Sequence, residues 1–272
     1  MSKSRLTISL SSSTLKKIDQ LIDKKEIRNR SHAIEHLLEQ SLKHRLKTAV
    51  ILAGGVKLPN ETMIKALTLI DKKPLISYTI DHLKKYGVEK VIIATNSRGK
   101  KIQELLGDGS QFNLTIDYLY EKKPLGTAGA IKNTKKLIKD TFYVIAGDIL
   151  TNINLEDMLE FHIQNKSLVT MAVKPRMSQD SYDNVFMQGH RIVDFKKRQL
   201  GQTASIVNTG IYIFEHEIFQ AIPDKTPTTL EQDVFPKLTE NNRLLAFPFQ
   251  GIWFDVSSDS NYKKVIKNIN QK

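Results

Sequence analysis

The hydrophobic pattern of the chain changes near residue 48, and this change most constrains the fold. The stretch before it is too short to build a core of its own. The much longer remainder alternates apolar segments of strand length with amphipathic segments of helix length. A short unit followed by a long alternating one predicts two domains, residues 1–46 and residues 47–272.

The first unit predicts one strand and two helices. Residues 5–10 alternate apolar and polar side chains, as a half-buried strand does. The serine run 11–13 supplies caps for a first helix that ends in a turn near residue 27, and Asn29 is the expected cap of a second. The second helix should bury Ala33, Ile34, Leu37, Leu38 and Leu42. Because a lone strand and so small a unit cannot satisfy their backbone or bury a core, we expect a homodimer with paired strands.

Two segments of this unit resemble the ribbon-helix-helix family of DNA-binding repressors, namely Arg5-Leu6-Thr7-Ile8-Ser9-Leu10 and Asn29-Arg30-Ser31-His32-Ala33-Ile34. The resemblance implies a ribbon in the major groove of double-stranded DNA, with Arg5, Thr7 and Ser9 on base edges. It also implies that amides near Arg30 and Ser31 contact a DNA phosphate. Family dimers often pair again on adjacent half-sites, which makes a tetramer a further option. The alternative is a unit that dimerises without binding DNA.

The charge of the chain is unevenly distributed. The sequence has 41 Lys+Arg against 29 Asp+Glu, a net charge of +12 at pH 7. Residues 1–47 hold 11 of the basic and 5 of the acidic residues, so half of the excess lies in about a sixth of the chain. This asymmetry favours a polyanion-binding module, although a solvated lysine-rich surface accounts for it equally well.

Other features exclude several classes of protein. The chain has no cysteine, which excludes disulfide scaffolds, thiolate metal sites and cysteine nucleophiles. It has no apolar run near the roughly 20 residues of a membrane span and no apolar stretch typical of a secretory signal at its start. We therefore expect a cytoplasmic protein. His32 and His36 are four residues apart but lack an evident third ligand, so we expect no metal there.

The larger unit predicts an α/β domain. Buried strands are expected at 49–52, 90–94 and 142–145, and helices lie near 74–86, 98–106 and 126–138. This alternation predicts a Rossmann-like fold with a mostly parallel sheet. Ligands then bind at the carboxyl ends of the strands.

The candidate site follows those strands. Ala53, Gly54 and Gly55 leave the first strand, and Gly126 and Thr127 open a helix, where glycines let backbone amides approach a nucleotide. Tight turns or close packing would account for the same glycines. Asp148 and Asp255 are expected at the same edge, and two carboxylates suit Mg²⁺, although each alone resembles an ordinary strand-end aspartate.

Seven segments in one order resemble the sugar-1-phosphate nucleotidyltransferase family over residues 47–272. They are Leu52-Ala53-Gly54-Gly55, Ile64-Lys65-Ala66-Leu67, Pro124-Leu125-Gly126-Thr127-Ala128-Gly129, Gly147-Asp148, Asn208-Thr209-Gly210-Ile211-Tyr212, Glu231-Gln232-Asp233-Val234-Phe235-Pro236 and Trp253-Phe254-Asp255-Val256. Family enzymes join a nucleoside triphosphate to a sugar 1-phosphate and release pyrophosphate. The resemblance implies nucleotide binding by Ala53, Gly54, Gly55, Gly126 and Thr127, phosphate binding by Lys65, sugar binding by Asn208 and Thr209, and Mg²⁺ binding by Asp148 and Asp255.

Two segments depart from the family pattern, and they are the ones that bind the triphosphate and the sugar in the family. The family continues from its glycines into a Gly-x-x-Arg-Leu loop, whereas this chain reads Val56-Lys57-Leu58-Pro59, which is shorter and lacks the arginine. Lys57 is the candidate replacement, but a point charge cannot reproduce the planar guanidinium fork. The family's Phe-x-Glu-Lys-Pro is here Phe195-Lys196-Lys197-Arg198. Lys197 and Arg198 therefore favour an anionic sugar ligand.

Three interpretations follow. The chain is a transcriptional regulator whose nucleotidyltransferase-like domain binds a nucleotide, sugar phosphate or nucleotide sugar as effector; or it is an active nucleotidyltransferase that also binds DNA; or it is an enzyme that uses the ribbon only to dimerise. Catalysis needs interactions specific to the transition state, so ligand binding survives the loss of the arginine loop more readily than turnover does. We therefore favour the first interpretation.

Overall fold

The computed structural model describes residues 7–42, 44–54, 64–176, 183–197 and 205–256. The chain divides into two compact units, Met1–His44 and Arg45–Lys272, and each is described by itself. The predictions made for Arg5, Gly55, Lys57 and Arg198 lie outside the described residues.

The smaller unit contains the helices α1 (Ser12–Asp19) and α2 (Arg30–Leu42). Both predicted caps are confirmed: Ser11 Oγ accepts the Thr14 N–H at 3.2 Å, and Asn29 Oδ1 accepts the His32 N–H at 2.9 Å. The first helix ends earlier than predicted. The Asp23 carboxylate accepts the amides of residues 25, 26 and 27, which builds a turn where the sequence pattern suggested more helix.

Apolar side chains of this unit remain exposed in a single chain. Ile18 and Ala33 are buried where α1 meets α2. In contrast, the exposed fractions are 46% for Ile8, 42% for Leu37 and 49% for Leu38. The expectation that Leu37 and Leu38 are buried is therefore wrong for one chain taken alone, since α1 packs over only part of α2. Residues 7–10 pair with no other strand among the described residues.

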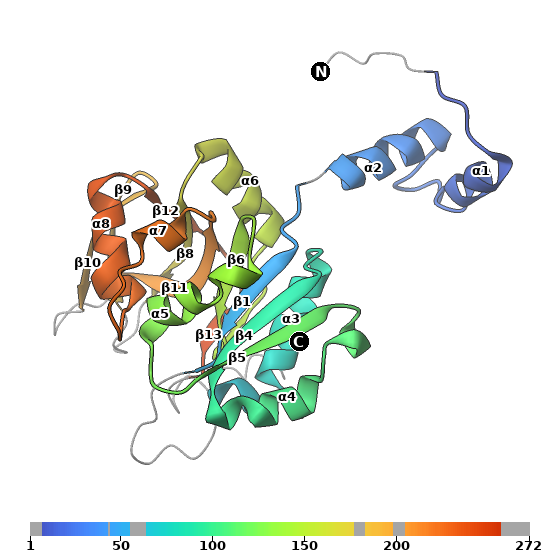
Figure 1. The fold of residues 1–272 in the computed structure, drawn as a ribbon. Helices are drawn as coiled ribbons and strands as arrows, with labels where there is room; N and C mark the ends of the chain where they lie inside the picture. The colour runs from blue at the N-terminus through green and yellow to red at the C-terminus, as the bar shows by residue number, and fades with distance from the viewer. Residues whose placement is uncertain (1–6, 43, 55–63, 177–182, 198–204, 257–272) are drawn as a thin grey trace. The chain divides into compact units, whose positions relative to one another are not determined.

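The larger unit is a three-layer domain built around a mixed sheet (Figure 1). The sheet of nine described strands has the order β5-β4-β1-β6-β11-β8-β12-β10-β9. Its strands are β1 (Thr48–Leu52), β4 (Lys90–Asn96), β5 (Thr115–Glu121), β6 (Phe142–Ala146), β8 (Val169–Arg176), β9 (Asp183–Gln188), β10 (Arg191–Lys197), β11 (Ser205–Phe214) and β12 (Leu244–Pro248). Two short ribbons accompany it: β2 (Leu69–Ile70) with β3 (Lys73–Pro74), and β7 (Ile149–Thr151) with β13 (Trp253–Asp255).

Parallel pairing is concentrated in the first half of the sheet. Strands β5, β4, β1 and β6 are all parallel, which confirms the three predicted strands and the α/β class. Their central residues are apolar and buried, as expected for strands covered on both faces. The second half is more mixed than the sequence pattern suggested. There β11 runs antiparallel to β6 and β8, and β10 runs antiparallel to β12 and β9.

Helices cover both faces of the sheet. On one face lie α3 (Leu75–Lys85), α4 (Lys100–Leu106) and α6 (Leu155–Asn165), and on the other lie α5 (Gly126–Asn133), α7 (Ile218–Ala221) and α8 (Phe235–Glu240). Short turns complete the unit: η1 (Lys65–Leu67), η2 (Ser97–Gly99), η3 (Ser110–Phe112), η4 (Lys135–Leu137) and the π-helix η5 (Leu230–Val234). Alternate strand residues enter opposite cores; Ile51 belongs to the first and Val50 to the second. Within the described ranges, no helix has the length and apolarity to cross a bilayer.

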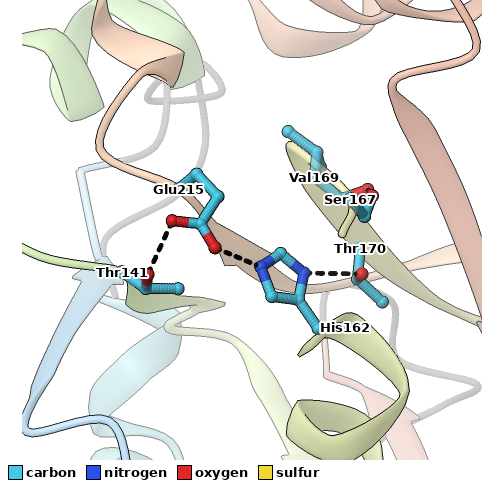
Figure 2. Close-up of polar contacts among 6 residues, drawn as sticks. All are labelled: Thr141, His162, Ser167, Val169, Thr170 and Glu215. Atoms are coloured by element: carbon cyan, nitrogen blue, oxygen red, sulfur yellow. Dashed lines mark hydrogen bonds and ion pairs between the residues drawn. The ribbon is translucent and has the colours of Figure 1, made fainter. Parts of the chain in front are cut away.

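A polar network around the buried side chain of His162 joins α6 to three strand ends (Figure 2). His162 Nε2 lies 2.9 Å from Glu215 Oε1, and its Nδ1 lies 2.8 Å from Thr170 Oγ1. Thr141 donates its hydroxyl to the other oxygen of Glu215 at 2.7 Å. A neutral ring that donates from Nε2 and accepts at Nδ1 satisfies all of these contacts. Burial lowers the pKa of His162 below its ordinary value, which keeps the ring neutral.

This network predicts a pH-dependent stability. A histidine whose pKa is lower in the folded state takes up a proton on unfolding, so stability is present above the unfolded pKa of about 6.5 and is lost as the pH falls below it. We expect His162→Gln to cost about 1–3 kcal/mol at pH 7, because buried Thr170 and partly exposed Glu215 lose the hydrogen bonds of the ring. The variant should then lose less stability than the wild type between pH 7 and pH 5. Thermal unfolding across this range measures both effects, with Gln164→Ala, at an exposed position of the same helix, as the control that should keep the wild-type profile.

Candidate functional site

The segment that leaves β1 is held at the carboxyl edge of the parallel strands. Ala53 N donates to Ala94 O at 2.8 Å, and Gly147 N donates to Leu52 O at 2.9 Å. The Asn96 side-chain amide donates to Gly54 O. A Cβ atom on Gly147 would lie 3.1 Å from both Ala53 Cβ and Leu52 O, so glycine permits this close approach. The backbone of residues 53 and 54 is therefore fixed between β4 and β6, at the edge where a ligand was predicted.

A carboxylate that the sequence analysis did not single out faces this segment. Both oxygens of Glu121, the last residue of β5, lie 3.7 Å from the position of a Cβ on Gly54. Glu121 Oε2 accepts the Leu125 N–H at 3.3 Å. Partial burial raises the pKa of Glu121. A signal in the sequence could have identified Glu121. It is an acidic residue at the end of a strand-like run, shortly before the Pro-Leu-Gly-Thr segment.

The structure brings Asp148 and Asp255 to adjacent positions. Asp148 follows β6, and Val256 N donates to its carbonyl oxygen at 2.9 Å. Asp255 pairs in register with Ile149, the residue after Asp148. Carboxylate oxygens are the ligands that Mg²⁺ prefers, and the metal typically takes one or two of them plus phosphate and water. In the described part of the chain, no group of three or more His, Cys, Asp or Glu side chains forms a larger metal site.

The start of α5 is bound by a distant segment of the same chain. Ala128 N and Gly129 N both donate to Thr228 O, at 3.0 and 3.1 Å. Thr127 Oγ1 accepts the Leu230 N–H at 2.8 Å and donates to Glu231 Oε2 at 3.2 Å. These amides and this hydroxyl thus have partners within the domain. The contacts favour the packing interpretation of the small residues here, and nucleotide binding by Gly126 and Thr127 stays a prediction.

Gly126 provides a direct test of this packing. Its φ is +78°, and an added Cβ would lie 2.3 Å from Thr228 O. We expect Gly126→Ala to destabilise the domain by more than the roughly 1–2 kcal/mol of a left-handed alanine, because the Thr228 segment must also shift. The control is Gly189→Ala, which has a φ of +59° with nothing within 4 Å of its Cβ. If urea unfolding shows that the two variants lose equal free energies of unfolding, the close packing of Gly126 against Thr228 is contradicted.

The predicted sugar and phosphate residues have defined places. Thr209 is 1% exposed, and its hydroxyl donates to Ala172 O at 2.7 Å. Asn208 is bound locally, since its Nδ2 donates to Tyr212 Oη at 2.8 Å and its Oδ1 accepts the Gly210 N–H at 3.0 Å. Lys197 ends β10 in register with Asp183, and Lys65 begins η1 beside α3. The observed hydrogen bonds of Asn208 and Thr209 thus hold β11 in place. Sugar binding by these two residues stays a prediction.

The candidate DNA-binding residues of the smaller unit are exposed. Thr7, Ser9, Arg30 and Ser31 all face solvent in the single chain. The Arg30 guanidinium holds the Asp19 carboxylate with two contacts of 2.7 and 2.9 Å, so this side chain joins the end of α1 to the start of α2. Phosphate binding predicted at the start of α2 would then use backbone amides while the Arg30 side chain braces the helix pair.

The comparisons with known proteins divide the chain as its two units do. Residues 48–272 match the family described as nucleotidyl transferase, which is most of the chain. The chain belongs to this nucleotidyltransferase family. Residues 4–44 match the ribbon-helix-helix proteins of the copG family. A ribbon-helix-helix domain is thus fused to a nucleotidyltransferase domain, as both resemblances implied.

Characterised relatives are sugar-1-phosphate nucleotidyltransferases. The D-glycero-alpha-D-manno-heptose 1-phosphate guanylyltransferase of Aneurinibacillus thermoaerophilus is 29% identical over 226 residues, which cover 81% of this chain and 97% of that protein. The catalytic subunit beta of the Danio rerio mannose-1-phosphate guanylyltransferase is 29% identical over 228 residues, covering 79% of this chain. The match spans 62% of that longer protein.

Solved structures share the fold of the larger unit. A putative glucose-1-phosphate thymidylyltransferase from Bacillus anthracis has a TM-score of 0.74 at 19% identity, covering 83% of this chain and 96% of that one. HddC from Yersinia pseudotuberculosis has a TM-score of 0.73 at 25% identity, covering 82% of this chain and all of that one. These matches cover nearly the whole length of each solved chain.

Proposed function

We propose that the chain is a DNA-binding transcriptional regulator whose nucleotidyltransferase domain binds a guanine nucleotide or GDP-sugar, with Mg²⁺, as its effector. The observation that carries this proposal is the fusion of a ribbon-helix-helix domain to a nucleotidyltransferase domain, and the backbone fixed at Ala53 and Gly54 offers the candidate nucleotide edge. The short loop after Gly54 argues against efficient turnover, because it lacks the arginine that the family uses on the triphosphate.

DNA binding by the smaller unit would require a dimer, because the ribbon needs strands from two copies. The exposed apolar side chains of Ile8, Leu10, Leu37 and Leu38 are the surface that a second copy would cover, and strands from two copies would pair at residues 5–10. The polar face of such a ribbon carries Thr7 and Ser9, together with Arg5, whose guanidinium suits guanine edges. DNA contact by these residues is part of the proposal.

The metal half of the proposal rests on the two neighbouring aspartates. Asp148 and Asp255 lie at adjacent positions and offer oxygen ligands of the kind that Mg²⁺ prefers. A bound Mg²⁺ supplies positive charge that offsets the charge of a triphosphate. Because Asp148 follows β6, the parallel neighbour of β1, a metal held by it would lie at the same edge of the sheet as Gly54.

Guanine is the proposed base because a carboxylate lies beside Gly54. A guanine ring presents two neighbouring donors, N1–H and the N2 amino group, to which one carboxylate can bind with both oxygens. Glu121 is half-buried at that place, and two of the relatives named above are guanylyltransferases. Uracil and thymine offer a single ring donor, so they satisfy only one oxygen.

Glu121→Gln should therefore weaken GTP binding by about 10–100-fold, the usual value of a bidentate base contact. It should change UTP binding much less, which reduces the preference for GTP. Calorimetric titration of the full chain with each nucleotide and Mg²⁺ measures the ratio. Glu104→Gln, at an exposed position of α4, is the matched control. An unchanged GTP to UTP ratio would contradict base recognition by Glu121.

Catalysis is the second candidate function, and the adjacency of Asp148 and Asp255 favours it. An active enzyme would transfer GMP from GTP to a sugar 1-phosphate and release pyrophosphate. The two functions are separated by a pyrophosphate-release assay of the full chain with Mg²⁺, each nucleoside triphosphate, and mannose 1-phosphate or D-glycero-D-manno-heptose 1-phosphate. The regulator proposal expects saturable GTP binding without release above the rate of the Asp148→Asn variant. Pyrophosphate release by the wild type that disappears in Asp148→Asn would show instead that the chain is an active nucleotidyltransferase.

A further inference from the structure

The connection between α5 and β6 carries three exposed lysines. Lys135 and Lys136 lie in η4, and Lys139 follows shortly before β6. Thr134 and Ile138, which flank these positions, are both buried. The backbone is therefore anchored to the core while the three ammonium groups face solvent. We refer to residues 135–139 as the lysine turn.

The charge of the lysine turn is not neutralised within the described part of the chain. None of its three lysines forms an ion pair with a described carboxylate. Direct contact with Lys132 lowers the pKa of Asp224, and the more distant charge of Lys135 adds to this effect. The dipole of α5 acts on its last turn, where Lys132 lies, so it does not account for Lys139. Exposed Asp140 offsets only part of the charge.

The lysine turn lies beside the start of β1. Lys90, the first residue of β4, donates from Nζ to Leu137 O, within the turn, at 3.4 Å. The backbone N–H groups of Glu89 and Lys90 both donate to Lys47 O at 2.9 Å, and Lys47 directly precedes β1. The turn and the starts of β4 and β1 are therefore neighbours at the amino edge of the parallel strands. Lys47 and Lys90 are themselves paired with Glu89 and Asp117, which leaves the turn as the unneutralised part of this surface.

The ribbon-helix-helix domain is attached to the chain at the same edge. Helix α2 ends at Leu42 and β1 begins at Thr48. A connection of this length spans at most roughly 20 Å, because an extended chain covers about 3.5 Å per residue. The connection therefore limits how far the lysine turn can be from DNA that the smaller unit binds. The candidate nucleotide edge is at the opposite end of the strands, so DNA at the amino edge would leave it accessible.

We propose that the lysine turn binds the phosphate backbone of the duplex that the ribbon-helix-helix domain reads, outside the bases that the ribbon contacts. This inference rests on the proposed DNA binding and adds a second contact, made by the larger domain. Lysine ammonium groups suit phosphate oxygens as compact charges, and phosphate contacts carry no base preference. Each phosphate that a lysine neutralises releases a counterion, so the contact increases both the affinity and its dependence on salt.

The salt dependence of DNA binding tests this inference. The affinity of the full chain for a duplex selected from a random library by the wild type is measured by fluorescence anisotropy over a series of salt concentrations, without nucleotide. The combined variant Lys135→Gln, Lys136→Gln and Lys139→Gln should bind about tenfold more weakly at physiological salt. The slope of log affinity against log salt should fall by about 2 or more, since each lost contact contributes about 0.9 and a dimer has two turns. The sequence preference should stay that of the wild type.

A matched variant controls for the loss of net charge. The combination of Lys100→Gln, Lys101→Gln and Lys237→Gln removes the same charge from exposed positions of α4 and α8. It should keep the wild-type salt slope, because these lysines lie outside the lysine turn.

A conservative variant controls for folding of the turn. The combination of Lys135→Arg, Lys136→Arg and Lys139→Arg keeps the positive charge and should retain the wild-type slope. A loss of slope in both the glutamine and the arginine variants would indicate a structural role and would contradict phosphate binding.

The inference is overturned if the glutamine variant of the lysine turn keeps the wild-type slope, or if the charge control lowers the slope equally. It is also overturned if that glutamine variant binds DNA like the wild type but no longer binds vesicles of phosphatidylcholine and phosphatidylserine, which would assign the turn to an anionic membrane surface. In each of these cases, sequence-specific DNA binding by the wild type would still stand. A wild-type chain that binds no duplex at low salt would instead overturn the proposed DNA binding and this inference together.

Discussion

Asp148→Asn is expected to weaken the Mg²⁺-dependent binding of GTP by about 100-fold or more. The change removes one of two neighbouring carboxylates and leaves Asp255 as the remaining acidic ligand at this edge. Even residues that only support a metal ligand typically alter affinity by about 10–100-fold, so losing a direct ligand should do at least as much. Calorimetric titration of GTP into the full chain, with and without Mg²⁺, measures the loss.

The control for this variant lies at the opposite end of the same strand. Asp140 is exposed and precedes β6, whereas Asp148 follows it. Asp140→Asn removes the same charge and should leave Mg²⁺-dependent binding unchanged. Asp255→Asn should reproduce the loss seen with Asp148→Asn, because the two residues would hold one metal. If Mg²⁺ enhances GTP binding equally in the wild type and in Asp148→Asn, the metal assignment is wrong.

Ile8→Glu is expected to abolish dimerisation and, with it, specific binding to DNA. In the proposed ribbon, Ile8 is covered by the second copy, and each dimer would bury two unpaired carboxylates. One such buried charge costs about 3–5 kcal/mol, so we expect the dimer Kd to rise by about 1,000-fold or more. Sedimentation at several concentrations measures the assembly. A mobility shift on a duplex selected from a random library by the wild-type chain measures DNA binding.

A second charge substitution in the same domain controls for electrostatic effects. Gln20→Glu adds an identical charge at an exposed position just after α1. It should leave the dimer intact and weaken DNA binding only slightly, since a single exposed charge contributes little. A dimeric Ile8→Glu variant would show that the apolar face of residues 6–10 does not form the interface.

Local structure was predictable where a few adjacent residues decide it. Ser11 and Asn29 cap their helices because a short polar side chain can reach the amides two or three residues ahead. The strands around Val50, Ile92 and Val144 were predictable because a strand covered on both faces must be a continuous apolar run. Such signals lie within a single segment of the sequence.

Contacts between distant segments were not predictable in the same way. The carbonyl of Thr228 binds the start of α5 from about a hundred residues away, and no local pattern announces that pairing. The approach of Glu121 to Gly54 depends on the parallel order of β5, β4 and β1, which only the assembled sheet defines. The exposure of Leu37 and Leu38 has another cause: an apolar stripe in the sequence predicts burial but does not say whether the same chain or a second copy covers it, and the structure describes one chain.

We expect nucleotide binding and DNA binding to be coupled in this chain. The affinity of the full chain for the selected duplex is measured at fixed ionic strength, with and without saturating Mg²⁺–GTP. Coupling predicts a changed DNA affinity, and reciprocity then requires that the duplex change GTP affinity by the same factor. Equal DNA affinities in the two conditions, with GTP shown to be bound, would contradict it.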